Sequence, residues 1–245
     1  MTVAYFDCFS GIAGDMILGA LIDAGLDVSF LKKELQKLDI AGYKIQTKKI
    51  SYNKITGTDV NIDTKETHVH RHLSDINYLI EKSKLDADIK KLSKQIFYNL
   101  AKAESKIHNI TIDEVHFHEV GAVDAIIDIV GSVIGIKKLG ITKIYCSPLP
   151  MGKGFVSCAH GILPIPAPAT VELVKGIPVY SDERAQELVT PTGAAIITTV
   201  ADQFGNIPLM KVNKIGYGSG KTKSDYPNLL RIFIGEIVSK QKNRK

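Results

Sequence analysis

The chain has 245 residues, 44% of them hydrophobic and 23% charged, which are the proportions of an ordinary globular protein. Its formal net charge is +5, but Lys240, Lys242, Arg244 and Lys245 contribute four of these positive charges within a basic tail at 238–245 that is predicted to be disordered. The remaining residues are therefore close to neutral. Because there is no tryptophan and no stripe of basic and aromatic side chains, binding to nucleic acid is not expected, whereas an acidic small-molecule substrate is compatible.

Cysteine usage and the N-terminal sequence both indicate the cytoplasm. Cys8, Cys146 and Cys158 are odd in number, widely spaced and without a CxxC pair, which argues against a disulfide framework or a structural zinc ribbon. The N-terminus has no cationic region followed by an apolar run and a cleavage site. The longest apolar stretch, at 125–136, carries Asp128 and is too short to span a bilayer. We therefore expect a cytoplasmic protein that does not bind a membrane.

Periodicity and turn signals predict alternating strands and helices, and therefore an α/β fold with a mixed sheet and helical insertions. The predicted strands are residues 3–6, 43–50, 58–62, 143–146, 211–216 and 229–237. The predicted helices are residues 12–24, 30–38, 73–80, 88–107, 122–139, 167–174 and 192–202. The segment 148–168 is rich in glycine and proline and is predicted to be an ordered loop system. Residues 1–237 are expected to form one region, with a candidate subdomain break near residue 147.

The turn that joins the first strand to the first helix contains two glycines and two acids, in the sequence DCFSGIAGD at 7–15. Small residues before a helix N-terminus leave N–H groups that bind anions, and a bridging Mg²⁺ would reconcile the two carboxylates with a phosphate. The alternative is a tight turn with an acid well placed in the first helical turn, and the spacing alone favours it. The candidate binding residues here are Asp7, Ser10, Gly11, Gly14 and Asp15.

Five of the seven histidines lie in two short clusters, which indicates metal binding. In an extended chain, residues two apart point to the same face and lie about 7 Å apart, so one adjacent pair can close on a metal. Three in a row can do so only if the loop curls. The alternatives are a surface pair without function and a pair hydrogen-bonded in the core, but the repeated clustering favours a transition metal. The candidate ligands are His68, His70, His72, His116 and His118.

Acidic residues follow the second histidine cluster. Asp124 and Asp128 are four residues apart on a predicted helix, share a face and sit among isoleucines and valines. A carboxylate in such surroundings must be paired, protonated or bound to a metal, so these two residues and Glu119 are candidate bases. Glu104 and His108, also four residues apart, offer a further ligand pair.

Two further segments invite a nucleotide-binding interpretation. The sequence GYGSGKT at 216–222 fails the P-loop pattern, because Ile215 stands where a glycine is required and residues 225–227 interrupt any following helix. It is interpreted instead as a glycine-rich loop that contacts phosphate. Thr190, Pro191 and Thr192 form a good helix start, which capping alone explains although it also suits an anion.

Several long motifs resemble the LarC family of nickel insertion proteins, in order from about residue 1 to 236. They are DCFSGIAGDM at 7–16, RHLSDI at 71–76, VHFHEVGAVD at 115–124, GKG at 152–154, HGILPIPAPA at 160–169 and LVTPTGA at 188–194. The resemblance implies a nickel chelatase of the lyase class that completes the nickel-pincer cofactor of lactate racemase and related enzymes. It would insert Ni²⁺ into pyridinium-3,5-bisthiocarboxylic acid mononucleotide, forming Ni–S bonds and a Ni–C bond with consumption of CTP.

The residues fit this implied reaction. Forming a metal–carbon bond displaces a proton, for which Glu119, Asp124 and Asp128 are candidate acceptors. Soft sulfur on the acceptor would draw nickel away from imidazole nitrogen. The acceptor's phosphate and acidic arms would favour helix N-termini and lysines, and the candidates are Lys153, Thr192 and Lys221. Our hypothesis is that His116 and His118, with Glu119 or Asp124, hold the nickel, while His68, His70 and His72 supply it.

The sequence departs from the family pattern in two ways. Longer members carry a richer histidine stretch and continue beyond residue 245, where the resemblance places CTP with Mg²⁺ or Mn²⁺. We therefore expect the N-terminal portion of such a protein, a homo-oligomer that works with a C-terminal part or partner chain. The alternatives are a nickel delivery module without chemistry and, less favoured, a metal-dependent phosphohydrolase that uses Asp7, Asp15 and the histidines.

Overall fold

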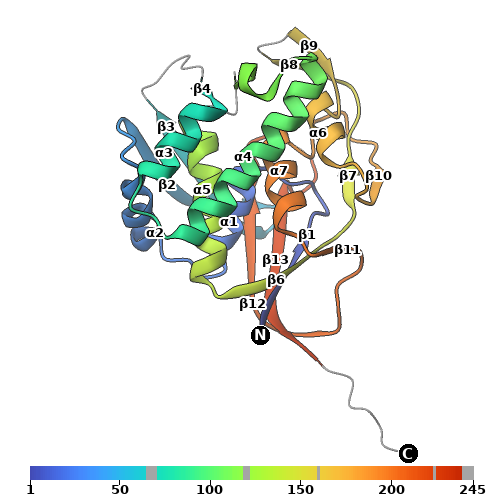
Figure 1. Ribbon diagram of the computed structural model, residues 1–245. Coiled ribbons are helices and arrows are strands. Elements are labelled where there is room, and N and C mark those ends of the chain that lie inside the picture. Colours follow the sequence, from blue (N-terminus) through green and yellow to red (C-terminus); the bar gives the residue numbers. More distant parts are fainter. Residues whose placement is uncertain (65–70, 118–121, 159–160, 223–224, 239–245) are drawn as a thin grey trace, which may run out of the picture.

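The computed structural model describes residues 1–64, 71–117, 122–158, 161–222 and 225–238, and a seven-stranded mixed sheet forms its centre (Figure 1). The strands of this sheet are β1 Thr2–Asp7, β2 Tyr43–Tyr52, β3 Ile55–Thr64, β6 Ile141–Cys146, β11 Gln203–Phe204, β12 Met210–Ser219 and β13 Leu229–Ile237. Their order is β11-β6-β1-β13-β12-β3-β2, with β1 parallel to β6 and antiparallel to β13. The predicted α/β class is confirmed, and strands from both ends of the chain meet at the middle of the sheet.

The helices pack in layers against this sheet, in front of it in the view of Figure 1. They are α1 Gly14–Asp23, α2 Val28–Leu35, α3 Leu73–Lys82, α4 Ala87–His108, α5 Val123–Lys138, α6 Pro168–Leu173 and α7 Pro191–Val200, with 3₁₀ turns at Gln36–Leu38 and Ile112–Glu114. Helix α1 contacts β3, β12 and β13, α5 packs on α1, and α4 packs on α5, α6 and α7. The carboxyl pair described below lies where α1, α5 and α7 meet.

Glycines bring the backbone of α1 unusually close to strand β12. A Cβ added to Gly218 would lie 1.8 Å from the Met16 carbonyl oxygen, and one added to Gly216 would lie 2.1 Å from the Ala20 carbonyl oxygen. The segment 216–219, interpreted from sequence as part of a phosphate-contacting loop, is therefore the end of a strand. That interpretation was wrong for these residues, because the glycines serve helix–strand packing.

Helix α5 is the central helix of the core and is apolar on nearly every side, as expected for a helix surrounded by protein. Its isoleucines Ile126, Ile127 and Ile129 are fully buried. Its Gly135 lets side chains from α1 and from the turn after α1 pack closely, since a Cβ there would lie 3.0 Å from Leu21 and 2.9 Å from Leu26. This burial fixes the rotation of α5, and so determines which of its carboxylates faces inward.

Short strands that were not predicted as sheet strands also occur. They are β4 Arg71–His72, β5 His116–Phe117, β7 Leu149–Met151, β8 Phe155–Cys158, β9 Gly161–Pro164 and β10 Val179–Ser181. β4 pairs with β5, β7 with β10 and β8 with β9. The segment predicted as an ordered loop system is thus built largely of paired strands, and runs this short are below the length at which alternation is readable.

Cys8 and Cys146 are buried as free thiols at adjacent positions beyond β1 and at the end of β6, with their Sγ atoms 3.6 Å apart. Across the described ranges, none of the helices combines the length and the apolar character needed to cross a membrane.

Candidate functional site

The two histidine clusters of the sequence meet at one point of the structure. Strand β4 pairs antiparallel with β5 and places His72 opposite His116. The centroids of the two imidazole rings are 3.9 Å apart, and the ring planes are inclined at 49°. The Nδ1 atom of His72 is buried and makes no hydrogen bond of ordinary geometry to any described residue. The arrangement brings together two nitrogen donors of the kind that bind divalent transition metals.

Buried neighbours on both sides fix the position of His116. Val115 and Phe117 are each 1% exposed, and the ring of Phe117 packs on that of Phe97 at 6.4 Å, while His116 itself points to the exposed side. The alternation expected from extended backbone therefore holds over these three residues. On the other strand, the backbone N–H of His72 donates to the Asp75 carboxylate at 2.8 Å, which anchors the start of α3.

The remaining predicted metal ligands cannot be placed. His68, His70 and His118, and the candidate base Glu119, lie outside the described residues. Within the part of the chain that is described, no group of three or more histidine, cysteine or acidic side chains is arranged to hold a metal ion. The further pair predicted on α4 is engaged internally, since Nε2 of His108 lies 3.3 Å from the Glu104 carboxylate.

Two acids from different helices, Asp15 on α1 and Asp128 on α5, form a second feature where the first turn of α1 meets α5. A Cβ added to Gly14 would lie 2.8 Å from Oδ2 of Asp128 and 2.9 Å from Cγ2 of Thr192, so α1, α5 and the start of α7 touch there. Oδ1 of Asp128 is buried and accepts no hydrogen bond from the described residues. Asp124, on the same helix, is exposed. The structure thus separates the two aspartates that the sequence treated alike.

Burial and mutual repulsion shift the acidity of this pair. Burial raises the pKa of Asp15 to about 6, against the opposing attraction of the Lys221 ammonium. Burial also raises the pKa of Asp128 well above its usual range, and the negative charges of Asp15 and Asp124 raise it further. Near neutral pH we therefore assign the proton to Asp128 and the negative charge to Asp15. Two carboxyl groups with separated proton affinities form a unit that can accept a proton.

Lys221 belongs to this acidic feature. Its Nζ atom donates to Oδ1 of Asp59 at 2.6 Å and to the carbonyl oxygen of Val60 at 2.5 Å, and lies 3.9 Å from Oδ2 of Asp15. Asp59 is only 5% exposed, so the lysine neutralises a buried carboxylate as well as facing Asp15. The lysine that the sequence suggested for a phosphate is held between two acids.

The first loop is held to the segment before α7. The N–H of Ile12 donates to the Leu188 carbonyl at 2.8 Å, and the N–H of Thr190 donates to the Ile12 carbonyl at 3.1 Å. Gly11 has φ +104°, and a Cβ there would lie 2.0 Å from the Leu188 carbonyl oxygen, so the close approach requires glycine. Oγ1 of Thr190 accepts from the N–H of Gly193 at 3.1 Å, which confirms the predicted helix start.

The other charged residues predicted to bind a ligand have partners within the protein. Asp7 accepts hydrogen bonds from Nε of Arg231 at 3.0 Å and from its Nη2 at 2.5 Å, and the guanidinium lies over the ring of Phe9 at 5.5 Å. Lys153 forms an exposed ion pair with Glu183. Binding by Asp7, Lys153 and the loop glycines stays a prediction.

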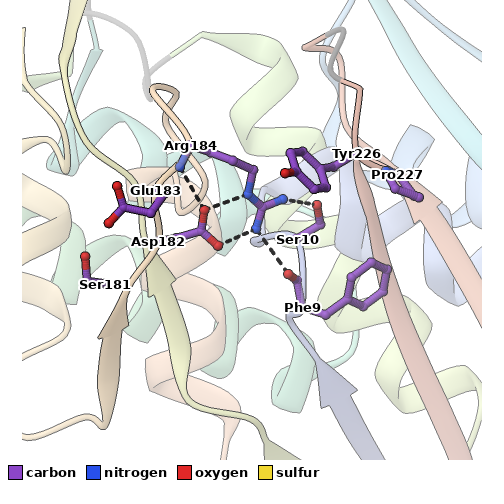
Figure 2. Close-up of a pocket in the computed structure, with 8 residues that line it drawn as sticks. All are labelled: Phe9, Ser10, Ser181, Asp182, Glu183, Arg184, Tyr226 and Pro227. Carbon is purple, nitrogen blue, oxygen red and sulfur yellow. Dashed lines mark hydrogen bonds and ion pairs between the residues drawn. The ribbon is translucent and has the colours of Figure 1, made fainter.

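A cavity of about 550 Å³ opens beside the first loop (Figure 2). It is lined by Phe9, Ser10, Ser181, Asp182, Glu183, Arg184, Tyr226 and Pro227. Arg184 crosses it and binds the Asp182 carboxylate through Nε and Nη2, each at 2.8 Å. The sequence reasoning missed Arg184, Tyr226 and Arg231. The one local signal was the charged run at 182–184, which is ambiguous by itself.

Comparison with known proteins identifies the family of the chain. The sequence model of a family described as nickel insertion protein matches residues 4–245. The chain is 51% identical over 245 residues to the pyridinium-3,5-bisthiocarboxylic acid mononucleotide nickel insertion protein of Desulfitobacterium hafniense, covering all of this chain and 61% of that protein. It is 46% identical over 253 residues to the protein of the same name from Acetivibrio thermocellus, covering 99% of this chain and 62% of that protein.

A protein of Dictyoglomus thermophilum, provisionally named a nickel insertion protein, is 57% identical over 238 residues, which are 97% of this chain and 62% of that protein. The chain therefore spans about three-fifths of the length of the relatives it matches. No solved structure matches it. The match along almost the whole sequence shows that the chain belongs to the nickel insertion protein family.

Proposed function

We propose that this chain inserts Ni²⁺ into pyridinium-3,5-bisthiocarboxylic acid mononucleotide, the precursor named for two of its relatives. The observation that carries the proposal is the contact between His72 and His116, which joins the two histidine clusters at a single place. Nickel is the cargo of the reaction, so the site must bind it and also release it. Two imidazoles suit that task, because the thiocarboxylate sulfurs of the acceptor are softer ligands and compete for the metal.

In this proposal His72 and His116 form the holding site for nickel. His68, His70 and His118, which belong to the same two clusters of the sequence, complete or feed it. This changes the hypothesis based on spacing, in which His116 and His118 held the metal and the first cluster only supplied it. The support is geometric: the cross-strand register sets one imidazole from each cluster side by side.

The carboxyl pair supplies the base. When nickel replaces hydrogen on the ring carbon, the C–H bond breaks, its electron pair forms the Ni–C bond, and the proton must go to an acceptor. Asp15, with a pKa raised to about 6, is ionised at neutral pH yet basic enough to take a proton. Asp128 holds the companion proton, and Lys221 steadies the negative charge on Asp15. Asp124 is exposed and is the weaker candidate; Glu119 stays a candidate outside the described residues.

The rest of the reaction is proposed from the resemblance alone. The chain covers 61% of the length of one such relative. We assign CTP consumption, with Mg²⁺ or Mn²⁺, to a C-terminal part or partner chain. The complete unit would be a cytoplasmic, homo-oligomeric chelatase of the lyase class that matures lactate racemase-type enzymes. We propose residues 1–237 as the nickel-handling unit, with Lys153 and Thr192 at the anionic arms of the precursor.

The test is a reconstituted insertion assay with the precursor, Ni²⁺, CTP and the C-terminal part. The His72→Ala/His116→Ala double variant should lose insertion, whereas His108→Ala, whose histidine pairs with Glu104, should retain it. Full insertion by the double variant contradicts the proposal. If a variant without Asp15 and Asp128 still binds nickel and still supports insertion, this chain would be a delivery module and the chemistry would belong to the C-terminal part. Phosphate release from simple nucleotides without precursor would favour a phosphohydrolase.

A further inference from the structure

The cavity of Figure 2 lies at the carboxyl end of strand β1, next to that of its parallel neighbour β6. Two of its lining residues, Phe9 and Ser10, come shortly after β1 in the first loop. In open α/β sheets, ligands bind in the crevice outside the carboxyl ends of the strands. The same loop continues into α1, whose second residue is Asp15. A ligand in the cavity would therefore contact the loop that leads to Asp15, the proposed base.

We infer that this cavity binds the planar pyridinium ring of the mononucleotide substrate, with Tyr226 as the stacking face and Arg184 as the partner of an acidic arm. The inference rests on the proposed function, because that function supplies the identity of the ligand. Its volume of about 550 Å³ lies in the range typical of small-molecule sites. Its lining combines aromatic, charged and hydroxyl groups, which suit a flat ligand with charged substituents.

Tyr226 is placed to take a ring. Its side chain comes from the segment before β13 and projects into the cavity near Ser10 and Arg184, with 62% of its surface exposed (Figure 2). The Arg184 guanidinium carbon lies 5.7 Å from the ring centroid. A pyridinium ring carries a formal positive charge, and cationic rings are attracted to the electron-rich face of an aromatic side chain.

Arg184 is held rigidly in the cavity. Besides its two bonds to Asp182, Nη1 donates to Oγ of Ser10 at 2.5 Å and Nη2 donates to the Phe9 carbonyl at 3.2 Å. Ser10 is 2% exposed, so one end of the guanidinium is fixed to a buried hydroxyl. Arginine has five N–H donors, and four of them are used in bonds to the described residues. One Nη1 hydrogen has no acceptor among the described residues and can donate to a carboxylate or thiocarboxylate arm.

The structure offers a matched control residue. Tyr78 on α3 is also a tyrosine with a large exposed surface, 68%, and it too has a cation over its ring, with Nζ of Lys82 at 5.8 Å from the centroid. It lines a different hollow, between α3 and α4. A ligand that merely favours exposed tyrosines would respond to both residues, whereas a ligand of the cavity responds only to Tyr226.

The test is calorimetric binding of nicotinic acid mononucleotide, a pyridinium mononucleotide with one carboxylate and no sulfur, which cannot be converted to the nickel product. Tyr226→Ala should weaken binding by about tenfold, as loss of one ring-stacking contact typically does. Tyr226→Phe should bind like the unchanged chain, and so should Tyr78→Ala. Arg184→Gln should weaken the carboxylate-bearing probe more than nicotinamide mononucleotide, which lacks that charge.

Equal binding by Tyr226→Ala and the unchanged chain overturns the inference, and so does failure of the unchanged chain to bind the probe. The result is separable from the proposed function. Binding that depends on Tyr226, in a chain unable to insert nickel into the true precursor, would keep the ring site and reject the insertion. Normal insertion by Tyr226→Ala would keep the proposed insertion function and reject the ring site.

Discussion

The imidazole rings of His72 and His116 lie with their centroids 3.9 Å apart, although the two residues belong to separate histidine clusters of the sequence. One residue from each of two short strands makes this contact, and the strands are anchored by α3 on one side and by Phe117 on the other. Metal binding at this point would link the segment before α3 to the segment before α5. The helix that carries Asp128 would then be tied to the metal site.

Replacing Asp15 with Asn should stabilise the fold at neutral pH. The folded-state pKa of Asp15 is raised to about 6, so its protonated form suits the fold and its ionised form is penalised. The stability it contributes is complete below the usual aspartate pKa and is lost as pH rises through about 6. Asp15→Asn removes this loss and should raise the free energy of unfolding at pH 7.5 by up to about 3 kcal/mol. Denaturant unfolding at pH 4 and pH 7.5 measures this difference in unfolding free energy, and Asp124→Asn, at an exposed position, is the control. Equal unfolding curves for Asp15→Asn and the unchanged chain at pH 7.5 would contradict the raised pKa of Asp15.

The rate of nickel insertion should rise with pH through about 6, because only the ionised Asp15 can accept the ring proton. Asp15→Asn should lower the rate by about 100-fold or more and abolish this step in the profile. Single-turnover insertion measured from pH 5 to 8 gives the curve, and Asp124→Asn should leave it in place. A flat profile for the unchanged chain would remove Asp15 from the chemistry.

Removing the ammonium of Lys221 should move that profile to higher pH. Lys221 lies 3.9 Å from Asp15 and lowers the pKa of that carboxyl against the effect of burial. Lys221→Met therefore makes Asp15 harder to ionise, and the midpoint of the profile should lie above 6. Lys106→Met removes an ammonium that pairs with Glu172 instead, and should leave the midpoint unchanged. A downward shift for Lys221→Met would show that the lysine acts elsewhere.

Gly14→Ala should disturb the carboxyl pair through packing alone. The added Cβ would lie 2.8 Å from Asp128 and 2.9 Å from Thr192, at the contact of three helices. We expect a loss of about 1–3 kcal/mol in unfolding free energy together with reduced insertion. Gly131→Ala, also in a helix, meets only flexible leucine ends at 3.2 Å and should change stability by less than about 1 kcal/mol. Denaturant unfolding of both variants measures the two changes. If Gly14→Ala and Gly131→Ala have the same unfolding free energy, the contact of α1, α5 and α7 tolerates the added methyl group and the prediction is wrong.

The alternation of strands and helices was readable from the sequence because most elements are long enough to show their period. The helix at 88–107 and the strand at 229–237 are observed at Ala87–His108 and Leu229–Ile237. The two-residue strands β4 and β5 were not readable, because they exist only through their pairing with each other. The glycines at 216 and 218 were misinterpreted because a loop glycine and a packing glycine are identical in sequence.

The candidate site was readable as a set of residue types but not as an arrangement. The sequence placed Asp124 and Asp128 on one helical face, whereas the packing of α5 on α1 decides that only Asp128 is drawn toward Asp15. The pairing of Asp7 with Arg231 depends on the antiparallel register of β1 and β13, strands from opposite ends of the chain. No spacing rule reaches across that separation.

The most direct test of the central claim is equilibrium Ni²⁺ binding by calorimetry, with Zn²⁺ as competitor. It compares the unchanged chain, the His72→Ala/His116→Ala double variant and His108→Ala. The account predicts that the double variant loses the tightest nickel site, while His108→Ala, which lacks only the partner of Glu104, keeps it. Unchanged nickel affinity and stoichiometry in the double variant would contradict the claim that this histidine pair holds the metal.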